Sequence, residues 1–467
     1  MDLNPDLCYR ALLTHDARFD GVFFVGVRST GIYCRTVCPA RTALKRNCEF
    51  FTAAAAAERE GYRPCLRCRP ELAPGNARVD APGRVAAAAA LRIEEGALSA
   101  DSVEGLAREF GITGRHLRRV VEAEFGVSPV ELAQTQRLLF AKRLLTDSSL
   151  PMTRVAFASG FRSLRRFNAL FRSRYRLKPR DIRRRHGTPS TTLTCELAYR
   201  PPLDWHGLLR FLGRRAAAGA EAVIEGRFLR TVARGWIAVG HDPRRRTLRV
   251  EVSSSLAPAL VTVLGGVKRL FDLGAEPRRI AAQLGKLGRP GLRVPGAFEG
   301  FEVAVRAVLG QQVTVRAAAT LAGRFVRAFG EPVETPHAAL THAWPTATRV
   351  AALPASRVAA LGIVSKRARC IVALARAVRD GQIRLAPGID VEGTKARLRE
   401  IPGIGAWTAE YVAMRALAWP DAFPHSDLGI RRALRTDDPD KILAIAQKWR
   451  PWRAYAAIAL WHSLEKP

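Results

Sequence analysis

Hydrophobic residues recur with two different periods along the chain. Helical spacing, with apolar residues every third or fourth position, runs through residues 83–187 and again from about residue 295 onward. Residues 228–256 instead alternate apolar and polar positions between Gly and Asp-Pro turns, which predicts strands. The pattern predicts a multidomain α+β protein. We expect a small α/β domain, an all-α domain, a small mixed α/β domain and a second all-α domain, at 1–77, 83–187, 194–290 and 291–467. Polar linkers are expected at 74–83 and 187–194.

The first helical region contains two similar helix pairs about fifty residues apart. Each pair turns at a glycine, Gly111 or Gly160, and the following helix begins after a capping residue, Thr113 or Ser163. Basic and polar side chains lie on the outer face of each second helix: Arg115 and Arg118 in the first, and Arg165, Arg166 and Asn168 in the second. A pair of plain helical hairpins with solvated charges is the alternative. The helix-turn-helix interpretation predicts that these residues contact the DNA major groove.

The second helical region contains a glycine-rich hairpin between two helices. The segment from Leu398 to Asp427 reads LREIPGIGAWTAEYVAMRALAWPDAFPHSD. Gly403 and Gly405 are expected to adopt positive φ in the turn. Such a turn exposes backbone amides at the start of the second helix, where they can bind a DNA phosphate. The segment ends on a single carboxylate, Asp427.

Composition points to a polyanionic partner. The net charge is +33 with a sequence pI near 11.2, and arginine suits phosphate better than a membrane surface. No apolar run reaches transmembrane length, and the beginning of the chain is unlike a secretory signal. We therefore expect a cytoplasmic protein that binds double-stranded DNA and no membrane.

Four of the eight cysteines form two short-spaced pairs. Cys34 and Cys38 are a C-x3-C pair, and Cys65 and Cys68 are a C-x2-C pair. Two thiolate pairs on separate loops predict one tetrahedral Zn²⁺ site. An iron–sulfur cluster and free buried cysteines are the alternatives.

The sequences GIYCRTVCPARTALKRN and GYRPCLRCRPE resemble the amino-terminal domain of the Ada alkylation-response proteins. The resemblance implies that Cys34 is both a zinc ligand and the nucleophile that takes a methyl group from a DNA phosphotriester. It also implies that Cys38, Cys65 and Cys68 are ligands only. Loss of one negative charge at the zinc centre is expected to strengthen DNA binding. Basic residues beside the cysteines are candidates for a phosphate groove: Arg35, Arg41, Lys45, Arg46, Arg67 and Arg69. The two helix pairs resemble the double DNA-binding module of AraC-type regulators.

The hairpin segment, together with the later KWRPWRAYAAIALWH, resembles the helix–hairpin–helix DNA glycosylases of the AlkA type. The resemblance implies that Asp427 is catalytic and that Gly403 and Gly405 contact DNA. The aromatic residues of the base pocket are then Trp407, Tyr411, Trp461 and Phe211. The wedge that fills the gap left by a flipped base falls at Gln312, where the family has an apolar residue. We therefore treat Gln311 and Gln312 as intercalation candidates.

Two absences narrow the expected chemistry. Trp407 stands where relatives that also cut the backbone have lysine, so a monofunctional glycosylase is expected. No cysteine follows Cys370, so no carboxy-terminal iron–sulfur cluster is expected, although a monovalent cation at the hairpin is a candidate.

The resemblances together imply DNA alkylation repair and its transcriptional regulation. The expected enzyme excises alkylated bases of the 3-methyladenine and 7-methylguanine type, and RNA polymerase is an expected partner. No Pro-Cys-His-Arg motif occurs, so reversal at O6-alkylguanine is not predicted. One alternative is a regulator whose glycosylase half only binds DNA. Another is a glycosylase with a purely structural zinc site.

Overall fold

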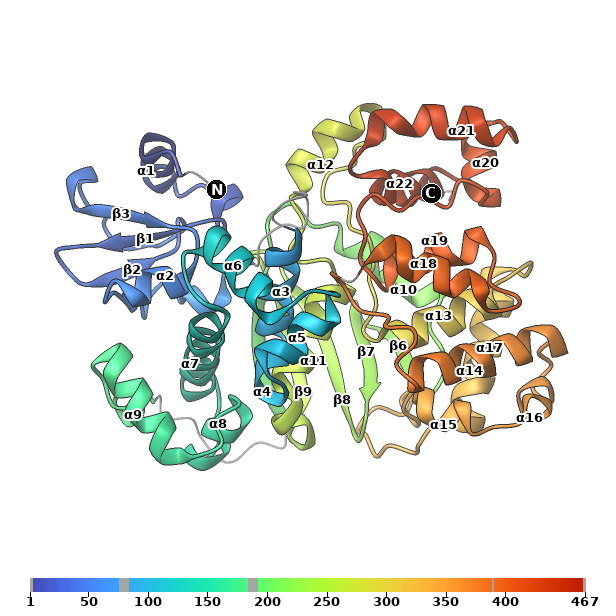
Figure 1. Cartoon of the computed structure of the whole chain (residues 1–467), viewed down its shortest axis with the longest axis horizontal. Helices are drawn as coiled ribbons and strands as arrows, with labels where there is room; N and C mark the ends of the chain where they lie inside the picture. Colours follow the sequence, from blue (N-terminus) through green and yellow to red (C-terminus); the bar gives the residue numbers. More distant parts are fainter. Residues whose placement is uncertain (1–2, 75–83, 184–191, 389, 465–467) are drawn as a thin grey trace. The chain divides into compact units, whose positions relative to one another are not determined.

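The computed structural model describes residues 3–74, 84–183, 192–388 and 390–464 (Figure 1). The chain divides into two compact units. One comprises residues 1–201 with 242–265, and the other comprises 202–241 with 266–467. Both predicted linkers fall largely outside the described residues. The multidomain α+β class is confirmed.

A four-stranded sheet organises the amino-terminal part, drawn in blue in Figure 1. Its strand order is β3-β1-β2-β4. Strands β2 and β4 are parallel, with Tyr33 opposite Pro64, so their carboxyl ends lie side by side. The elements of this part are α1 (Pro5–Leu13), β1 (Phe24–Val27), β2 (Ile32–Cys34), β3 (Cys48–Phe51), α2 (Ala54–Arg59) and β4 (Arg63–Pro64). This sheet places the cysteine of β2 next to the cysteine that follows β4.

Two helix-turn-helix units follow, joined by one long helix. Thr113 and Ser163 cap their second helices through side-chain oxygens, as predicted. Gly111 and Gly160 lie in the predicted turns, and both have positive φ. Leu117 and Phe167 are fully buried, since the apolar stripe of each second helix faces its partner helices. The helices are α3 (Arg84–Glu94), α4 (Ala97–Ala100), α5 (Val103–Glu109), α6 (Gly114–Phe125), α7 (Pro129–Asp147), α8 (Met152–Ala158) and α9 (Leu164–Tyr175).

Five strands and three helices make up the next region. Strand β5 (Thr192–Ala198) pairs antiparallel with β9 (Thr247–Ser253) in the first unit. In the second unit, β7 (Arg227–Val232) pairs antiparallel with β6 (Glu221–Ile224) and with β8 (Gly235–Asp242). The helices are α10 (Trp205–Arg214), α11 (Leu260–Leu270) and α12 (Pro277–Leu284).

Most of the remaining helices, those between residues 300 and 415, build one large apolar core. Helices α13, α17 and α19 pack at its centre, and their inward faces carry Val, Ala, Leu and Ile side chains. The helices from residue 300 onward are α13 (Gly300–Leu309), α14 (Val315–Phe329), α15 (Ala347–Ala351), α16 (Ala355–Ala359), α17 (Ser365–Arg379), α18 (Val391–Glu400), α19 (Ala406–Arg415), α20 (Leu428–Leu434), α21 (Pro439–Ala446) and α22 (Arg453–Ser463). Among the described helices, none has both the length and the apolar character needed to span a bilayer.

A buried ring of four charges joins the strands of the second unit to α13. Arg230 on β7 lies 2.7 Å from Glu221 on β6 and also pairs with Glu302 on α13. Arg306 lies 2.6 Å from each of the same two carboxylates. Burial opposes ionisation of Glu302, but Arg230 and Arg306 outweigh it and lower its pKa to about 2. The ring therefore keeps its charges and fixes the sheet on the helical core.

Candidate active site and metal centre

The four predicted cysteines converge on one point. Cys34 ends β2, Cys38 follows in the next loop, and Cys65 and Cys68 follow β4. Their sulfur atoms all lie within 4.8 Å of one another. A tetrahedral Zn²⁺ with Zn–S bonds of about 2.3 Å needs S···S distances of about 3.8 Å, so the cluster fits this ion. Four thiols this close cannot ionise independently, and hydrogen bonding among them raises the pKa of Cys34 and Cys68. A bound dication removes that competition, and the zinc site predicted from the spacing is confirmed.

Cys34 differs from the other three ligands in its surroundings. It is half-buried, whereas Cys38, Cys65 and Cys68 are buried. The amide of Arg35 donates to the Cys68 sulfur at 3.4 Å, and another backbone amide donates to the Cys65 sulfur at the same distance. Hydrogen bonds of this kind draw charge from a thiolate and make it a weaker nucleophile. Cys34 is thus the most accessible sulfur of the four.

Two arginines expected to line a phosphate groove are directed inward instead. Arg35 is buried, donates to Asp20 from Nε at 2.8 Å and donates to the Cys68 carbonyl from Nη1 at 3.1 Å. Arg69 has φ +53 and pairs with Asp147 at 2.6 Å. The groove expectation is therefore wrong for these two residues, because each is committed to a carboxylate of the fold. Other candidates of that group are exposed: Arg41, Lys45, Arg46 and Arg67.

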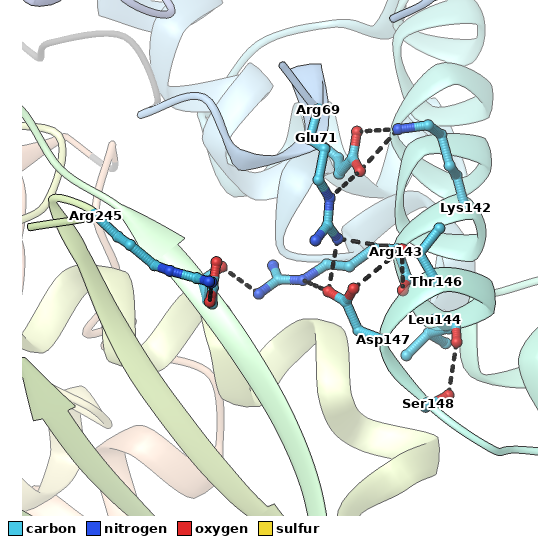
Figure 2. Close-up of polar contacts among 10 residues, drawn as sticks. Arg69, Glu71, Lys142, Arg143, Leu144, Thr146, Asp147, Ser148 and Arg245 are labelled. Carbon is cyan, nitrogen blue, oxygen red and sulfur yellow. Dashed lines mark hydrogen bonds and ion pairs between the residues drawn. The ribbon is translucent and has the colours of Figure 1, made fainter. Parts of the chain in front are cut away.

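Figure 2 shows how the second cysteine loop is fixed to α7. Glu71 accepts from Lys142 with both carboxylate oxygens, at 2.8 and 2.7 Å, and both side chains are almost fully buried. Arg69 reaches Asp147 at the end of the same helix. Arg143 donates in turn to the backbone carbonyl of Glu196 on β5. A continuous polar network thus runs from the residue after a zinc ligand to the helix that joins the two DNA-binding units.

The predicted DNA-reading residues lie on α6 and α9, the second helix of each unit. Arg115, Arg165 and Arg166 are exposed, and Asn168 is half-buried. Arg118 is also exposed but pairs with Glu104 on α5 at 2.6 Å. Its charge is therefore less available to DNA than that of its neighbours.

In the hairpin between α18 and α19, the two glycines have different reasons to be there. Gly403 has φ +103, and a Cβ there would lie 3.1 Å from the Cβ of Cys370. Gly405 has φ −91, so the expectation of a positive φ at this position is wrong. Gly405 is the N-cap of α19, provides no side-chain cap, and has open space around its missing Cβ. The first amides of α19 are consequently open to an external acceptor.

Asp427 lies at the start of α20, where four N–H groups hold its carboxylate. The Trp461 indole donates to Oδ1 at 2.8 Å, and the Trp407 indole donates to Oδ2 at 2.9 Å. The amides of Gly429 and Ile430 also donate to Oδ1, at 2.8 and 3.1 Å. This set of donors, at a helix amino terminus, fixes the orientation of the carboxylate.

The predicted aromatic residues gather beside this carboxylate. Trp407 stacks on Tyr411 with ring centres 5.3 Å apart, and the Trp461 ring centre lies 6.2 Å from that of Tyr411. Phe211 comes from α10 and is buried. The guanidinium of Arg215 lies 3.7 Å from its ring centre and that of Arg415 lies 5.1 Å away. Phe211 is therefore linked to the aromatic group through Arg415, whose guanidinium also lies 5.6 Å from the Tyr411 ring centre.

Arg415, which the sequence analysis did not single out, supports this aromatic group. It is buried, donates to the carbonyl groups of Pro295 and Gly296 at 2.7 and 3.1 Å, and donates to the Tyr411 hydroxyl at 2.8 Å. Burial opposes ionisation of Tyr411, but Arg415 and Arg215 outweigh it and lower the Tyr411 pKa. The only indication in the sequence was that Arg415 follows Tyr411 by four residues, which places both side chains on one face of α19.

The two intercalation candidates lie in the turn between α13 and α14 but differ in orientation. Gln312 is exposed with φ +54. Gln311 is half-buried, and its amide donates to the Gly403 carbonyl at 2.8 Å and to the Thr408 hydroxyl at 3.0 Å. The intercalation prediction for Gln311 thus has no support in its geometry, whereas Gln312 is accessible. The monovalent cation expected at the hairpin stays a prediction. The Gly403 carbonyl oxygen, which lies in the hairpin, already accepts a hydrogen bond from Gln311 with one of its two lone pairs.

Comparison with known proteins agrees with this geometry along nearly the whole chain. Four family models match: the metal binding domain of Ada at residues 7–71, a helix-turn-helix domain at 106–185, the AlkA N-terminal domain at 194–299, and the HhH-GPD superfamily base excision DNA repair protein at 305–442. A Mycobacterium tuberculosis protein named probable bifunctional transcriptional activator/DNA repair enzyme AlkA is 39% identical, over 98% of this chain and 96% of that protein. The chain belongs to this bifunctional AlkA family.

Two further relatives each cover one part of this AlkA family member. DNA-3-methyladenine glycosylase 2 of Escherichia coli is 37% identical over 57% of this chain and 96% of its own length. The bifunctional transcriptional activator/DNA repair enzyme Ada of Escherichia coli is 36% identical over 30% of this chain and 38% of its own length. The resemblances to the Ada and AlkA families are thereby confirmed.

Gly429 is a second site residue of this AlkA family member that the sequence analysis missed. A Cβ at this position would lie 2.9 Å from Cδ1 and 3.3 Å from Nε1 of Trp461. The absence of a side chain therefore lets the indole reach Asp427. No sequence pattern predicted this role of Gly429, because a glycine in LGIRRAL does not indicate that an aromatic ring packs on it.

Proposed function

We propose that this chain is a monofunctional DNA glycosylase of alkylated purines, joined to a methyl-accepting transcription activator. The observation that carries the glycosylase activity is Asp427, whose carboxylate is held by four donors beside three aromatic rings. Acceptance of a methyl group on Cys34 is the second part of the proposal.

The geometry of Asp427 favours electrostatic stabilisation over proton removal. Cleavage breaks the bond between the sugar C1′ and the base nitrogen, and the electron pair leaves with the base. An alkylated purine is already cationic, so it departs neutral and the positive charge develops on the sugar. Four hydrogen bonds already occupy the carboxylate oxygens of Asp427, and its negative charge is placed to stabilise that sugar. Water then adds to C1′ and releases its proton to solvent.

The aromatic residues have a separate task in this mechanism. A base flipped out of the duplex loses its stacking energy, and a cationic base recovers it on electron-rich rings. Trp407, Tyr411 and Trp461 present such rings within reach of Asp427. The indole N–H groups point to the carboxylate, so one contact orients both the rings and the anion.

Base release from methylated duplex DNA tests the glycosylase. Asp427→Asn keeps the shape of the side chain and removes its charge. We expect excision by this variant to fall by about 10²–10³-fold, as is typical when an electrostatic stabiliser of the transition state is lost. Binding to undamaged DNA should remain unchanged. No base release by the wild-type protein would contradict the proposal and favour the alternative of a regulator with a DNA-binding platform.

The second part of the proposal assigns methyl transfer to Cys34. The thiolate attacks the methyl carbon, the methyl–oxygen bond breaks, and the phosphate leaves as a diester anion while a thioether forms. The four cysteines would hold Zn²⁺, which would keep the sulfur deprotonated at neutral pH. The reaction supplies no route back, so each molecule reacts once. Methylation removes one negative charge near DNA, and tighter promoter binding follows.

Mass spectrometry after incubation with methylated DNA tests this step. We expect one added methyl group on the peptide that carries Cys34 and none on the buried ligands. A protein that releases bases but gains no methyl group would leave the zinc site purely structural.

Recruitment of RNA polymerase and a cytoplasmic location are parts of this proposal, since both follow from action at promoters.

A further inference from the structure

The turn between α13 and α14 has little packing of its own. Residues 312–316 are all exposed, including Val313 and Val315. The turn begins where α13 ends at Leu309, and α14 starts after Thr314 caps it. Exposed turns of this kind move readily unless a neighbouring element holds them.

The Gln311 amide provides that restraint. Its Nε2 donates to the Gly403 carbonyl in the hairpin at 2.8 Å and to the hydroxyl of Thr408 in the first turn of α19 at 3.0 Å. Thr408 is buried, so its hydroxyl is a fixed partner. These contacts join segments more than ninety residues apart in the sequence.

The two segments joined in this way have different tasks under the proposed function, on which the following inference rests. The open amides at the start of α19 suit a DNA phosphate, and Gln312 is the exposed side chain available to fill the gap in the base stack. Both tasks concern the same flipped nucleotide, so the distance between the two segments must be fixed.

We infer that Gln311 is a positioning residue that sets the wedge turn in register with the hairpin. It touches neither base nor phosphate and acts through Gln312. Its side chain must donate a hydrogen bond, because the Gly403 carbonyl can only accept. Glutamate has the same length and shape, but its ionised carboxylate cannot donate and is repelled by that carbonyl. Gln311→Glu therefore breaks the contact with little change in volume.

The experiment measures binding of the full chain to two duplexes, one undamaged and one with a stable abasic analogue. For Gln311→Glu we expect a loss of about 10- to 100-fold in affinity for the abasic duplex, from the lost hydrogen bond to Gly403 and the repulsion between its carbonyl and a half-buried carboxylate. Affinity for undamaged DNA should stay within about threefold, since the basic amino-terminal domains supply it. Gln382→Glu is the matched control, because this glutamine is exposed and the same charge there has no such partner.

A double variant separates positioning from a general structural defect. If Gln311 acts through Gln312, then Gln311→Glu combined with Gln312→Ala should bind the abasic duplex no more weakly than the worse single variant. Additive losses, or wild-type binding by Gln311→Glu, would overturn the inference. Binding of the abasic duplex needs no base release, so Asp427→Asn can serve as the background. A failed glycosylase assay and a failed positioning role therefore give different results.

Discussion

Lys142→Met tests whether the buried pair in Figure 2 fixes the zinc-binding loop to α7. The Lys142 and Glu71 side chains are 1% and 2% exposed, and the ammonium contacts both carboxylate oxygens at 2.7–2.8 Å. Methionine has nearly the same length but no charge, so the change leaves a buried carboxylate without its main partner. Removing one member of such a pair typically costs about 3–5 kcal/mol. Arg69 remains 3.1 Å from Glu71, which places the expected cost near the lower end.

Hydrogen exchange of the full chain is the suitable measurement, because a multidomain chain does not unfold in one step. A loss of about 3 kcal/mol in local stability should speed exchange of amides in residues 65–72 and in α7 by about 150-fold. The double variant Lys142→Met with Glu71→Gln buries no charge and should recover most of the protection. Arg245→Ala, also in Figure 2, is the control: its pair with Glu196 is exposed and should contribute below about 1 kcal/mol. Wild-type exchange in the single variant, or no recovery in the double variant, would refute the reasoning.

Three further predictions concern the active site, a buried acid and the metal. Gly429→Ala should displace the Trp461 indole from the Asp427 carboxylate and slow base release by about tenfold or more, whereas Leu428→Ala at the exposed neighbouring position should not. Burial raises the pKa of Glu58 to about 7 from 4.5, so folding favours its protonated form. Stability of the first unit should therefore fall by about 3 kcal/mol as pH rises from 4.5 to 7, and thermal melting of Glu58→Gln should lack this slope. Chelation of zinc should abolish the methyl adduct but leave base release unchanged; loss of both activities would contradict separate sites.

Features that depend only on neighbouring residues in the sequence were predicted correctly. The caps at Thr113 and Ser163 and the turn at Gly160 depend on neighbouring residues, and all three are found. The cysteine spacing likewise predicted the metal cluster. In the fold, the parallel strands β2 and β4 bring the two cysteine pairs together. Gly405 marks the limit of this reasoning, because glycine has two reasons to occupy a turn. Its φ is ordinary, and a Cβ there would meet no atom of the described structure, so the fold itself gives no reason for glycine at this position.

Direction of a side chain was much harder to predict. Gln311 and Gln312 are identical neighbours, yet only Gln312 is exposed, because positive φ at Gln312 turns the chain between them. The buried ring of charges around Arg230 and Glu302 could not be predicted from the sequence for a similar reason. Its partners come from β6, β7 and α13, and no spacing in the sequence relates them.

The same limit applies to the use of net charge as evidence for DNA binding. Arg35 is neutralised by Asp20 inside the fold, and Arg230 and Arg306 together by two glutamates, so these cations add little to the electrostatic field outside the protein. Each internal pair, however, also consumes a carboxylate, and pairing inside the fold leaves the net charge of +33 unchanged. The excess must therefore be carried largely by exposed arginines such as Arg165 on α9. Arg415 is an exception, since the described structure gives it two carbonyls and a phenol but no carboxylate. Its uncompensated charge lies against the aromatic rings proposed to hold a cationic base. Under the proposed function, those rings bind the base by stacking and with the help of the nearby anion of Asp427, so the carboxylate is expected to contribute to base binding as well as to bond cleavage.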